Sequence, residues 1–533
     1  MKNYKQNIAL VLVAIIMITQ SGCLKGDLLS NPNVAAESST ISPSLILNHL
    51  TSNLMKEEEP IISSVYRYNQ NIVSNYSYYF GSNSYGWSNT SDNYDNLKYC
   101  AKMEEQSKKQ TGNTTNIYFA LSAYFKAYTF IWISQRVGDI PMSQAGDPVT
   151  YPNPAYDKQK DIFKNALVLL ENANGLINDL YSKTTVKPSD KVDATGDIYG
   201  LSYQQWQKVI NTYRLRVLIS LSKRADDNPD LNVKSQFAAI VTNPAKYPIM
   251  TSNSDNMYYR YTAITFYPPN RAGYAPYNNC ENINKTYLDL LKVNNDPRLY
   301  VLTTPALKLI KQGKMVSDSS AYLGEDNTKT QSSFSNFSSD SAHSCLNYNR
   351  YMSSASGANC EPYILIGYPE MCFNIAEAAN KGWLPNVTAS VWYANGVNAS
   401  LNLYGITQNK VVTIGNYDGT NTNIGSVSLD VNTFLGRVGY AGDNAAGLNQ
   451  ILTQKYIAFF MNSGFESFYN WRRTGVPTFA QGGAGVGTPS TNIPLRWQYP
   501  NAESIYNTTN YNAALQSQYG GTDDLTAKMW LIK

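Results

Sequence analysis

Histidine is nearly absent from this chain of 533 residues, which contains only His49 and His343. Catalytic triads of the Ser-His-Asp and Cys-His types and multi-histidine metal sites all depend on imidazole groups. The sequence also lacks the G-x-S-x-G and H-E-x-x-H motifs. The glycine-rich residues 482–487 lack the Lys-Ser/Thr of a phosphate-binding loop and indicate a connector. A glycoside hydrolase needs only two carboxylates about 5 to 9 Å apart, so it stays the enzymatic alternative to a non-catalytic protein.

A strong net charge is also missing, since 43 Lys and Arg residues face 39 Asp and Glu residues and leave +4. Such a balance argues against the basic surface that a nucleic-acid partner requires. The six cysteines contain no C-x-x-C pair, which leaves a zinc or redox site without support. Cys345 and Cys360 flank one polar segment, and a disulfide between them is compatible with an oxidising compartment. We therefore expect no nucleic-acid partner, no metal and no cofactor.

The N-terminus carries the pattern of a secretion signal. Lys2 and Lys5 precede an unbroken apolar run over residues 8–18, the charge and length pattern of a signal peptide. The run is too short for a comfortable transmembrane helix. The sequence therefore predicts export from the cytoplasm.

The end of this run resembles the cleavage box of bacterial lipoproteins. Ser21 and Gly22 are small residues directly before Cys23, although Gln20 departs from the aliphatic residue that is usual there. A lipid on Cys23 with two or more acyl chains gives stable anchoring, at about 0.8 kcal/mol per buried methylene. The alternative is an ordinary signal peptide cut near Gly22. The predicted division is a signal peptide over residues 1–22, a lipidated N-terminus and tether over 23–40, and a body over 41–533.

Apolar residues recur at three- and four-residue spacing in several stretches, which predicts helices. Residues 116–137 are apolar on nearly every side, and such a helix must be buried. This pattern stops at residues 138–141, where Pro141 disfavours helical geometry in the preceding residue. Further helices are predicted over residues 157–180, 203–224, 368–381, 388–404 and 449–462.

Long polar segments separate these helices, at residues 75–95, 244–280, 311–361 and 407–433. Loops of such length in a compact protein are usually functional or disordered. Strand-like pieces such as residues 410–414 are short and isolated. Helices joined through short turns do not each cover their own apolar face, so they are expected to stack. We predict a mainly α fold, a tetratricopeptide-like helix-hairpin scaffold with large irregular, loop-rich insertions.

A set of short motifs runs through the chain, at residues 120–128, 137–141, 154–159, 206–216, 295–299, 370–378, 393–397, 468–477 and 493–500. No single motif is specific, but their order and spacing together are. In this order and spacing the chain resembles the SusD/RagB family of nutrient-binding outer-membrane lipoproteins. The resemblance covers the whole mature length.

This resemblance implies a function as well as a fold. It implies a surface-exposed lipoprotein of the outer membrane that is not an enzyme. Such a protein binds a nutrient, in the first place an oligosaccharide, and delivers it to a SusC-like TonB-dependent transporter. A peptide or another nutrient is the alternative ligand within this class. A purely structural or adhesive surface protein is the alternative outside it.

Candidate ligand-binding residues come from the aromatic content of two polar loops. The chain contains 42 tyrosines, whose flat apolar ring and polar tip suit wet recognition surfaces. A sugar site needs exposed rings beside amides, hydroxyls or a guanidinium, and residues 78–89 and 266–279 have that composition. The candidates are Tyr85, Trp87 and Asn89 in the first loop and Tyr267, Arg271, Tyr274 and Tyr277 in the second.

Each of these rings has a competing interpretation, a place under its own loop or against the transporter, because aromatic residues are also enriched at interfaces. Trp87 is the first choice for ligand contact because it offers the largest stacking area. Trp87→Ala should weaken ligand binding by about 1 to 3 kcal/mol, the scale of base–aromatic stacking, without a matching loss of thermal stability.

Overall fold

The computed structural model describes residues 40–57, 63–76, 81–90, 93–183, 185–261, 281–351, 361–415, 423–483, 486 and 492–533. Two compact units divide the chain, Met1–Ser42 and Pro43–Lys533, and the second contains every described helix and strand. The predicted signal peptide, the tether up to residue 39 and Cys23 lie outside the described residues and stay predictions.

Membrane-spanning helices were searched for over the same described ranges. No helix there is both long enough and apolar enough to cross a membrane.

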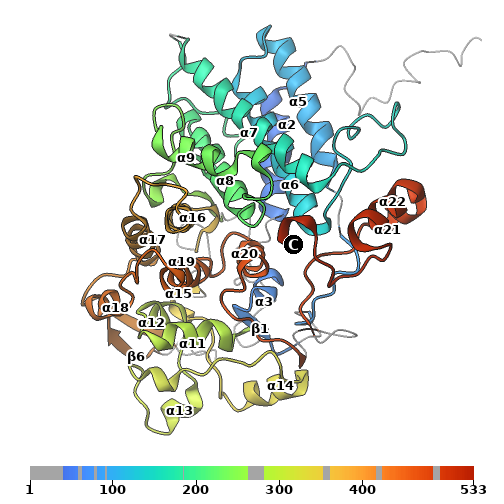
Figure 1. Ribbon diagram of the computed structural model, residues 1–533. Helices are drawn as coiled ribbons and strands as arrows, with labels where there is room; N and C mark the ends of the chain where they lie inside the picture. Colours follow the sequence, from blue (N-terminus) through green and yellow to red (C-terminus); the bar gives the residue numbers. More distant parts are fainter. Residues whose placement is uncertain are drawn as a thin grey trace, which may run out of the picture. The chain divides into compact units, whose positions relative to one another are not determined.

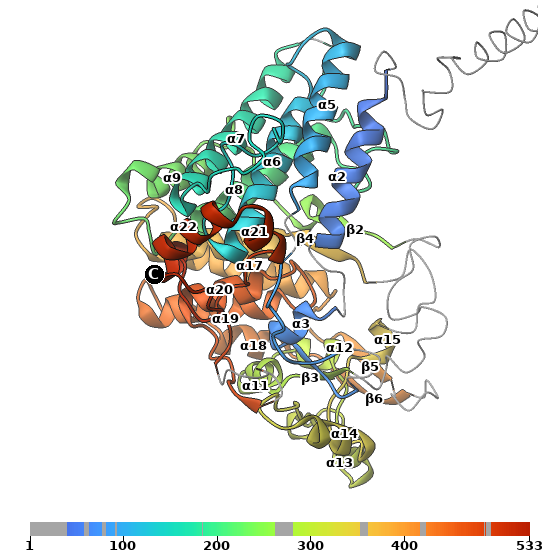
Figure 2. The same ribbon diagram turned by 90° about the vertical axis from the view of Figure 1, so that its right-hand side faces the viewer.

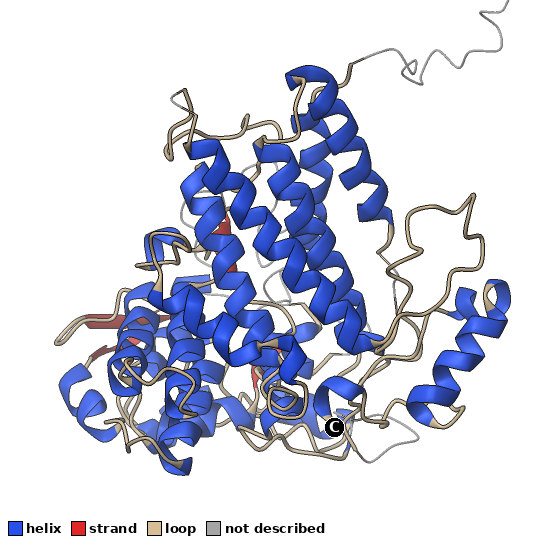
Figure 3. Ribbon diagram, turned by 45° about the horizontal axis from the view of Figure 1, so that its top comes forward, coloured by secondary structure: helices blue, strands red, loops and turns tan. Residues whose placement is uncertain are grey.

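A bundle of helices forms the upper part of Figure 1, where it is coloured blue to green, and the upper part of Figure 3. Helix α5 packs against α6, α6 against α7, α7 against α8, and α8 against α9; α2 packs against α5. This arrangement confirms the predicted helix-hairpin scaffold, and we call it the hairpin bundle. Its members are α2 (Pro43–Glu57), α5 (Asp95–Thr111), α6 (Ile117–Val137), α7 (Gln159–Tyr181), α8 (Tyr203–Ser220) and α9 (Val233–Thr242).

Local capping fixes the ends of the central helices. Asn116 begins α6 by accepting a hydrogen bond from the Phe119 amide at 3.1 Å, which satisfies one of the free N–H groups of the first turn. Ser202 and Gln205 form a reciprocal capping box at the start of α8. Helix α6 ends at Val137, the predicted end of the helical pattern, and Gly138 is its C-cap. Its side chains are buried on nearly every side, as the sequence predicted.

The remaining described elements form a mixed region, which Figures 1 and 2 show in yellow to red with part of the blue segment. Helix α16 packs against α17 and α19 and also against α8 of the hairpin bundle. The α-helices are α3 (Val65–Tyr68), α11 (Lys285–Val293), α12 (Arg298–Leu302), α13 (Leu307–Lys311), α14 (Gln331–Ser339), α15 (Tyr348–Tyr351), α16 (Tyr368–Asn380), α17 (Ala389–Leu403), α18 (Val431–Arg437), α19 (Ala445–Ala458), α20 (Glu466–Thr474), α21 (Asn501–Tyr506) and α22 (Thr508–Tyr519). Short 3-10 helices are η3 (Pro229–Leu231), η4 (Asn253–Asp255), η6 (Ser319–Ala321) and η9 (Trp530–Ile532).

Three antiparallel two-stranded sheets lie within the described parts of the long polar segments and at their edges. Strands β1 (Ile72–Ser74) and β3 (Glu281–Ile283) pair with Ile72 opposite Ile283. Strands β2 (Met257–Tyr259) and β4 (Tyr363–Ile366) pair with a register shift after Met257. The predicted strand-like piece at 410–414 is β5 (Val411–Gly415), which pairs with β6 (Asn423–Ser428). These segments therefore carry more regular structure than their polar composition predicted.

Buried ion pairs join the hairpin bundle to the mixed region. Arg216 of α8 donates to both carboxylate oxygens of Glu370 in α16, at 2.7 and 2.6 Å. Within the mixed region, Arg473 of α20 binds Glu377 of α16, the helix that packs against α8. Burial alone would raise the pKa of Glu377, but the Arg473 guanidinium outweighs it and the pKa is lowered. Such pairs stabilise little on balance, but removing one partner leaves a buried charge and costs about 3 to 5 kcal/mol.

Candidate functional site

The first candidate loop follows β1 and is described over residues 81–90. Asn83 fixes its start, because its side chain accepts from the Ser74 amide at 2.8 Å and donates to the Ser74 carbonyl at 2.7 Å. The loop is therefore tied to the end of β1. A loop with such ties holds its side chains in one arrangement.

Tyr85 and Trp87 point into the protein and not into solvent. Their exposed fractions are 5% and 3%. The Trp87 ring stacks on Trp497 with centroids 3.7 Å apart and meets Phe468 edge-on at 4.8 Å. We call this group the aromatic cluster; its members are Tyr68, Tyr85, Trp87, Phe465, Phe468 and Trp497.

The expectation that these two rings are exposed is therefore wrong. The physical reason is a partner far along the chain, since the Gln498 amide donates to the Trp87 carbonyl at 3.0 Å and Trp497 covers the indole. The Tyr85 hydroxyl donates to the Tyr68 carbonyl at 2.7 Å, and burial raises the pKa of Tyr85 well above its usual range. Both buried side chains therefore anchor the loop to the protein interior.

Asn89 remains exposed at the outer end of the loop. Its side-chain oxygen accepts a hydrogen bond from the Asn501 amide at 3.0 Å, at the first residue of α21. Helix α21 presents Ile505 and Tyr506 to solvent with exposed fractions of 67% and 77%. The Asn89 amide is thus exposed beside the start of α21, and the end of α21 exposes an apolar side chain and an aromatic ring.

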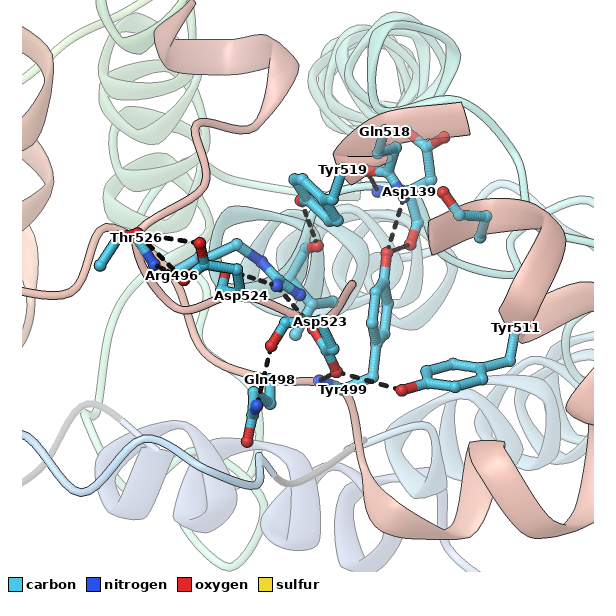
Figure 4. Close-up of polar contacts among 12 residues, drawn as sticks. Asp139, Arg496, Gln498, Tyr499, Tyr511, Gln518, Tyr519, Asp523, Asp524 and Thr526 are labelled. Carbon is cyan, nitrogen blue, oxygen red and sulfur yellow. Dashed lines mark hydrogen bonds and ion pairs between the residues drawn. The ribbon is translucent and has the colours of Figure 1, made fainter. Parts of the chain in front are cut away.

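The C-terminal segment that carries α21 and α22 is fastened to the end of α6, at the motif of residues 137–141 (Figure 4). Tyr499 donates its hydroxyl to the Asp139 carbonyl at 2.6 Å. The Gln518 side chain accepts from the Asp139 amide at 2.7 Å, and Tyr519 donates to the Val137 carbonyl at 2.7 Å. The motif is therefore a docking point for the last part of the chain.

Gly138 is required at this docking point. Its φ of +101° lies in the left-handed region that glycine adopts readily. A Cβ atom there would lie 2.3 Å from the Gln518 side-chain oxygen and 2.4 Å from the Tyr519 hydroxyl. The glycine thus permits the close approach of α22.

A second set of contacts stiffens the same segment (Figure 4). Arg496 is fully buried and lies 2.5 Å from the Asp523 carboxylate, with its guanidinium 4.1 Å from the centre of the Tyr519 ring. The Asp523 carboxylate also accepts from the Tyr499 amide at 3.0 Å and from the Tyr511 hydroxyl at 3.3 Å. These contacts hold α21 and α22 at the side of the first candidate loop.

The second candidate loop, with Tyr267, Arg271, Tyr274 and Tyr277, lies outside the described residues. Its described entrance is the end of β2, where the exposed Arg260 guanidinium lies 4.3 Å from the Tyr258 ring centre and donates to the Tyr258 hydroxyl at 2.8 Å. A ring and a guanidinium side by side are suited to sugar recognition. This pair was not predicted from the sequence. The only local sign of it was the alternating pattern of residues 257–261, which is typical of a strand with one face exposed.

Two hollows are lined by described residues other than those of the first loop. One has a volume of about 440 Å³ and lies between α7, α8 and η3–α9, with Leu167, Val168 and Leu231 beside the Arg214–Glu171 ion pair. The other has about 400 Å³ and is lined by residues of α11 and α19 and by the turn after α20. Both volumes are in the range of small-molecule sites. Within the described ranges, no group of three or more His, Cys, Asp or Glu residues is arranged to hold a metal ion.

A family model described as "SusD-like, starch-binding associating with outer membrane" matches residues 32–500. Among solved structures, a SusD homologue from Bacteroides fragilis is 26% identical, with a TM-score of 0.75 and coverage of 92% of this chain and 100% of that one. An outer-membrane protein from Bacteroides vulgatus is 27% identical, with a TM-score of 0.73 and coverage of 92% and 100%. A chitin-binding SusD homologue from Flavobacterium johnsoniae shares the fold at 19% identity, with a TM-score of 0.64 and coverage of 92% and 98%. No curated protein matches the chain. The family model covers most of the sequence, and the chain belongs to the SusD-like family.

Proposed function

We propose that the protein is a lipid-anchored, surface-facing binding protein of the outer membrane that captures an oligosaccharide and passes it to a SusC-like TonB-dependent transporter. The observation that carries this proposal is the family match over residues 32–500. The lipoprotein box at Cys23 supports the anchor. Binding without catalysis agrees with a sequence that has two histidines and lacks the hydrolase motifs named above.

Ligand contact is proposed for the surface beside the first loop and for the second loop. Asn89 supplies an exposed amide next to α21, while Arg271, Tyr267, Tyr274 and Tyr277 supply a cation and rings. We now assign Tyr85 and Trp87 an indirect role, because their burial leaves little ring surface for stacking. They would hold Asn89 in place from beneath.

The direct test is titration calorimetry of the purified protein with oligosaccharides of different linkage, starch-derived and chitin-derived chains first. Chitin-derived chains are included because two proteins of the same fold are named chitin-binding. We expect saturable binding of one glycan class and no change in the glycan by mass spectrometry. Reproducible cleavage by the pure protein would instead support the glycoside hydrolase, and binding of peptides alone would support the other nutrient class.

The transporter partner is tested separately. The protein, purified from outer membranes in mild detergent, should bring a large β-barrel protein with it. A Cys23→Ala variant should leave the membrane fraction while staying folded, because it loses the acyl chains. Unchanged membrane retention of this variant would contradict the anchor, and a protein that purifies alone would favour the structural or adhesive alternative.

A further inference from the structure

A small cavity lies where α20 meets α6 and α8, the helices labelled at the centre of Figure 1. It is lined in part by Trp132 and Arg136 of α6, Arg216 of α8 and Glu466 of α20. Its volume of about 10 Å³ leaves room for a single molecule of about the size of water. A monatomic ligand therefore fits, and a sugar, phosphate or sulfate does not.

Four side chains of α6 line this cavity, Tyr128, Trp132, Gln135 and Arg136, and two of them, Trp132 and Arg136, can only donate hydrogen bonds. The Arg136 guanidinium makes one described hydrogen bond, from Nη1 to the Trp132 carbonyl at 3.1 Å, although a guanidinium has five N–H donors. The Trp132 ring is 8% exposed, and its Nε1–H has no hydrogen-bond partner among the described residues. Both groups donate and neither accepts, so together they favour an acceptor that carries negative charge.

Arg136, Arg216 and Glu466 line the cavity and belong to a buried network whose charges do not balance. Among the described residues, this network holds five cations and three carboxylates, and each of the eight side chains is at most 9% exposed. The cations are Arg136, Arg216, Arg472, Arg473 and Lys455, and the carboxylates are Glu370, Glu377 and Glu466. An unpaired buried charge is costly, so such a group needs a compensating anion.

Two arginines of this network, Arg136 and Arg472, form no ion pair with a carboxylate among the described residues. Arg472 donates to the carbonyls of Leu495 and Gln135, at 2.9 and 2.5 Å, and Arg136 donates to a carbonyl as described above. Burial lowers the pKa of Arg472 to about 10, and the positive charge of Arg136 acts in the same direction. Arg216 and Arg473, by contrast, bind Glu370 and Glu377.

We propose that this cavity binds one halide ion, chloride under ordinary conditions, between Arg136 and the Trp132 indole N–H. The size of the cavity selects a monatomic ligand, its donors select an acceptor, and the excess of cations selects an anion over water. The bound ion would stabilise the junction of the hairpin bundle with α20. This inference is independent of the proposed glycan binding.

A halide titration of thermal unfolding tests the proposal. Sodium gluconate is exchanged for sodium chloride or bromide at constant ionic strength, so that general screening of charges stays the same. A ligand that binds only the folded protein raises Tm, and the rise saturates as the site fills. We expect a saturable rise for the wild-type protein with chloride and bromide.

Two variants separate the cavity from other arginine–tryptophan pairs. Arg136→Gln should raise the halide concentration of half-saturation on the order of tenfold or more, because a charged donor is lost. Arg224→Gln is the matched control, since Arg224 lies 5.8 Å from the Trp530 ring, pairs with Asp227 and does not line the cavity. The control should keep the wild-type halide response.

Crystals of the full chain grown in bromide give a direct answer that does not depend on the variants folding. An anomalous peak within hydrogen-bond distance of Arg136 and Trp132 Nε1 would support the proposal. Density without anomalous signal would identify a water and overturn it. Equal Tm in chloride and gluconate would also overturn it.

Discussion

The first candidate loop and the end of β2 differ in what their aromatic residues do. In the loop of residues 81–90, Tyr85 and Trp87 are buried and tie the loop to the C-terminal segment. At the end of β2, Tyr258 is half-buried and lies beside the exposed Arg260. Aromatic rings in polar segments thus serve either as anchors or as surface, and burial distinguishes the two roles.

The largest expected effect comes from breaking the anchor. Trp87→Ala removes a buried ring that stacks on Trp497 and meets Phe468, and should lower the free energy of unfolding by about 3 to 5 kcal/mol. Chemical denaturation of both proteins measures this. A loss of less than about 1 kcal/mol would contradict the anchor role and favour a solvent-exposed Trp87 ring.

Gly138→Ala tests the docking point of the C-terminal segment, which contacts the first loop through Trp497 and Asn501. The new Cβ meets Gln518 and Tyr519 at less than 2.5 Å and adopts a φ of +101°, so we expect a loss of about 2 to 4 kcal/mol. Gly112→Ala is the control, because its φ of +72° is similarly strained but its Cβ meets nothing within 4 Å. Equal losses in both variants would mean that strain alone, and not the approach of α22, requires the glycine.

The helices could be predicted because their own apolar spacing and their tertiary packing agree. Residues 116–137 form α6 within one residue of the prediction. The helix predicted over residues 388–404 likewise matches α17 within one residue at each end. Helix α19 begins at Ala445 and not at residue 449, because Asn444 caps it through the Ala446 and Gly447 amides. Helix α5 escaped prediction because most of its side chains are charged or polar and its buried stripe is narrow, with Leu97, Cys100 and Met103.

The roles of the loop rings could not be predicted from the sequence. Trp87 is buried by Trp497, a partner that no local pattern connects to it. The composition of residues 81–90 is the same for an exposed ring as for a covered one. Arg472 and Arg473 show the opposite case, since a buried guanidinium must find carbonyls or carboxylates wherever the fold places it.

The free energy of unfolding should depend on pH through Glu325, which is linked by hydrogen bonds to the residue that follows β1. Asn75 after β1 donates to Asn282 at 3.0 Å, and Asn282 donates to Glu325 at 3.2 Å. Burial raises the pKa of Glu325 from 4.5 to about 7. Below pH 4.5 the carboxyl is neutral in both the folded and the unfolded chain. As pH rises from 4.5 toward 7, the unfolded chain ionises first, so stability falls through this window and then levels off.

Glu325→Gln should remove this dependence. Between pH 4.5 and 7.5 the wild type should lose roughly 1 to 3 kcal/mol relative to the variant, measured by denaturant unfolding at each pH. Glu105→Gln, on the exposed face of α5, should keep the wild-type slope in this window because the Lys109 and Lys102 partners hold the pKa of Glu105 at about 2. Parallel curves for wild type and Glu325→Gln would contradict the role of Glu325.

The smallest effect on stability is expected at the surface pair at the end of β2, Tyr258 and Arg260. Arg260→Ala removes an exposed guanidinium whose described contacts are the ring and hydroxyl of Tyr258, so unfolding should change by less than about 0.5 kcal/mol. Ligand binding should weaken by about 1 to 3 kcal/mol if the guanidinium donates to a sugar hydroxyl, the range for a charged hydrogen bond. Lys98→Ala is the matched control, because Lys98 of α5 is also exposed and also lies over a tyrosine ring, 5.4 Å from the centre of Tyr99. Calorimetry that gives both variants wild-type affinity would remove the end of β2 from the site, whereas loss in Arg260→Ala alone would identify the β2 pair as recognition surface and separate it from the anchors of the first loop.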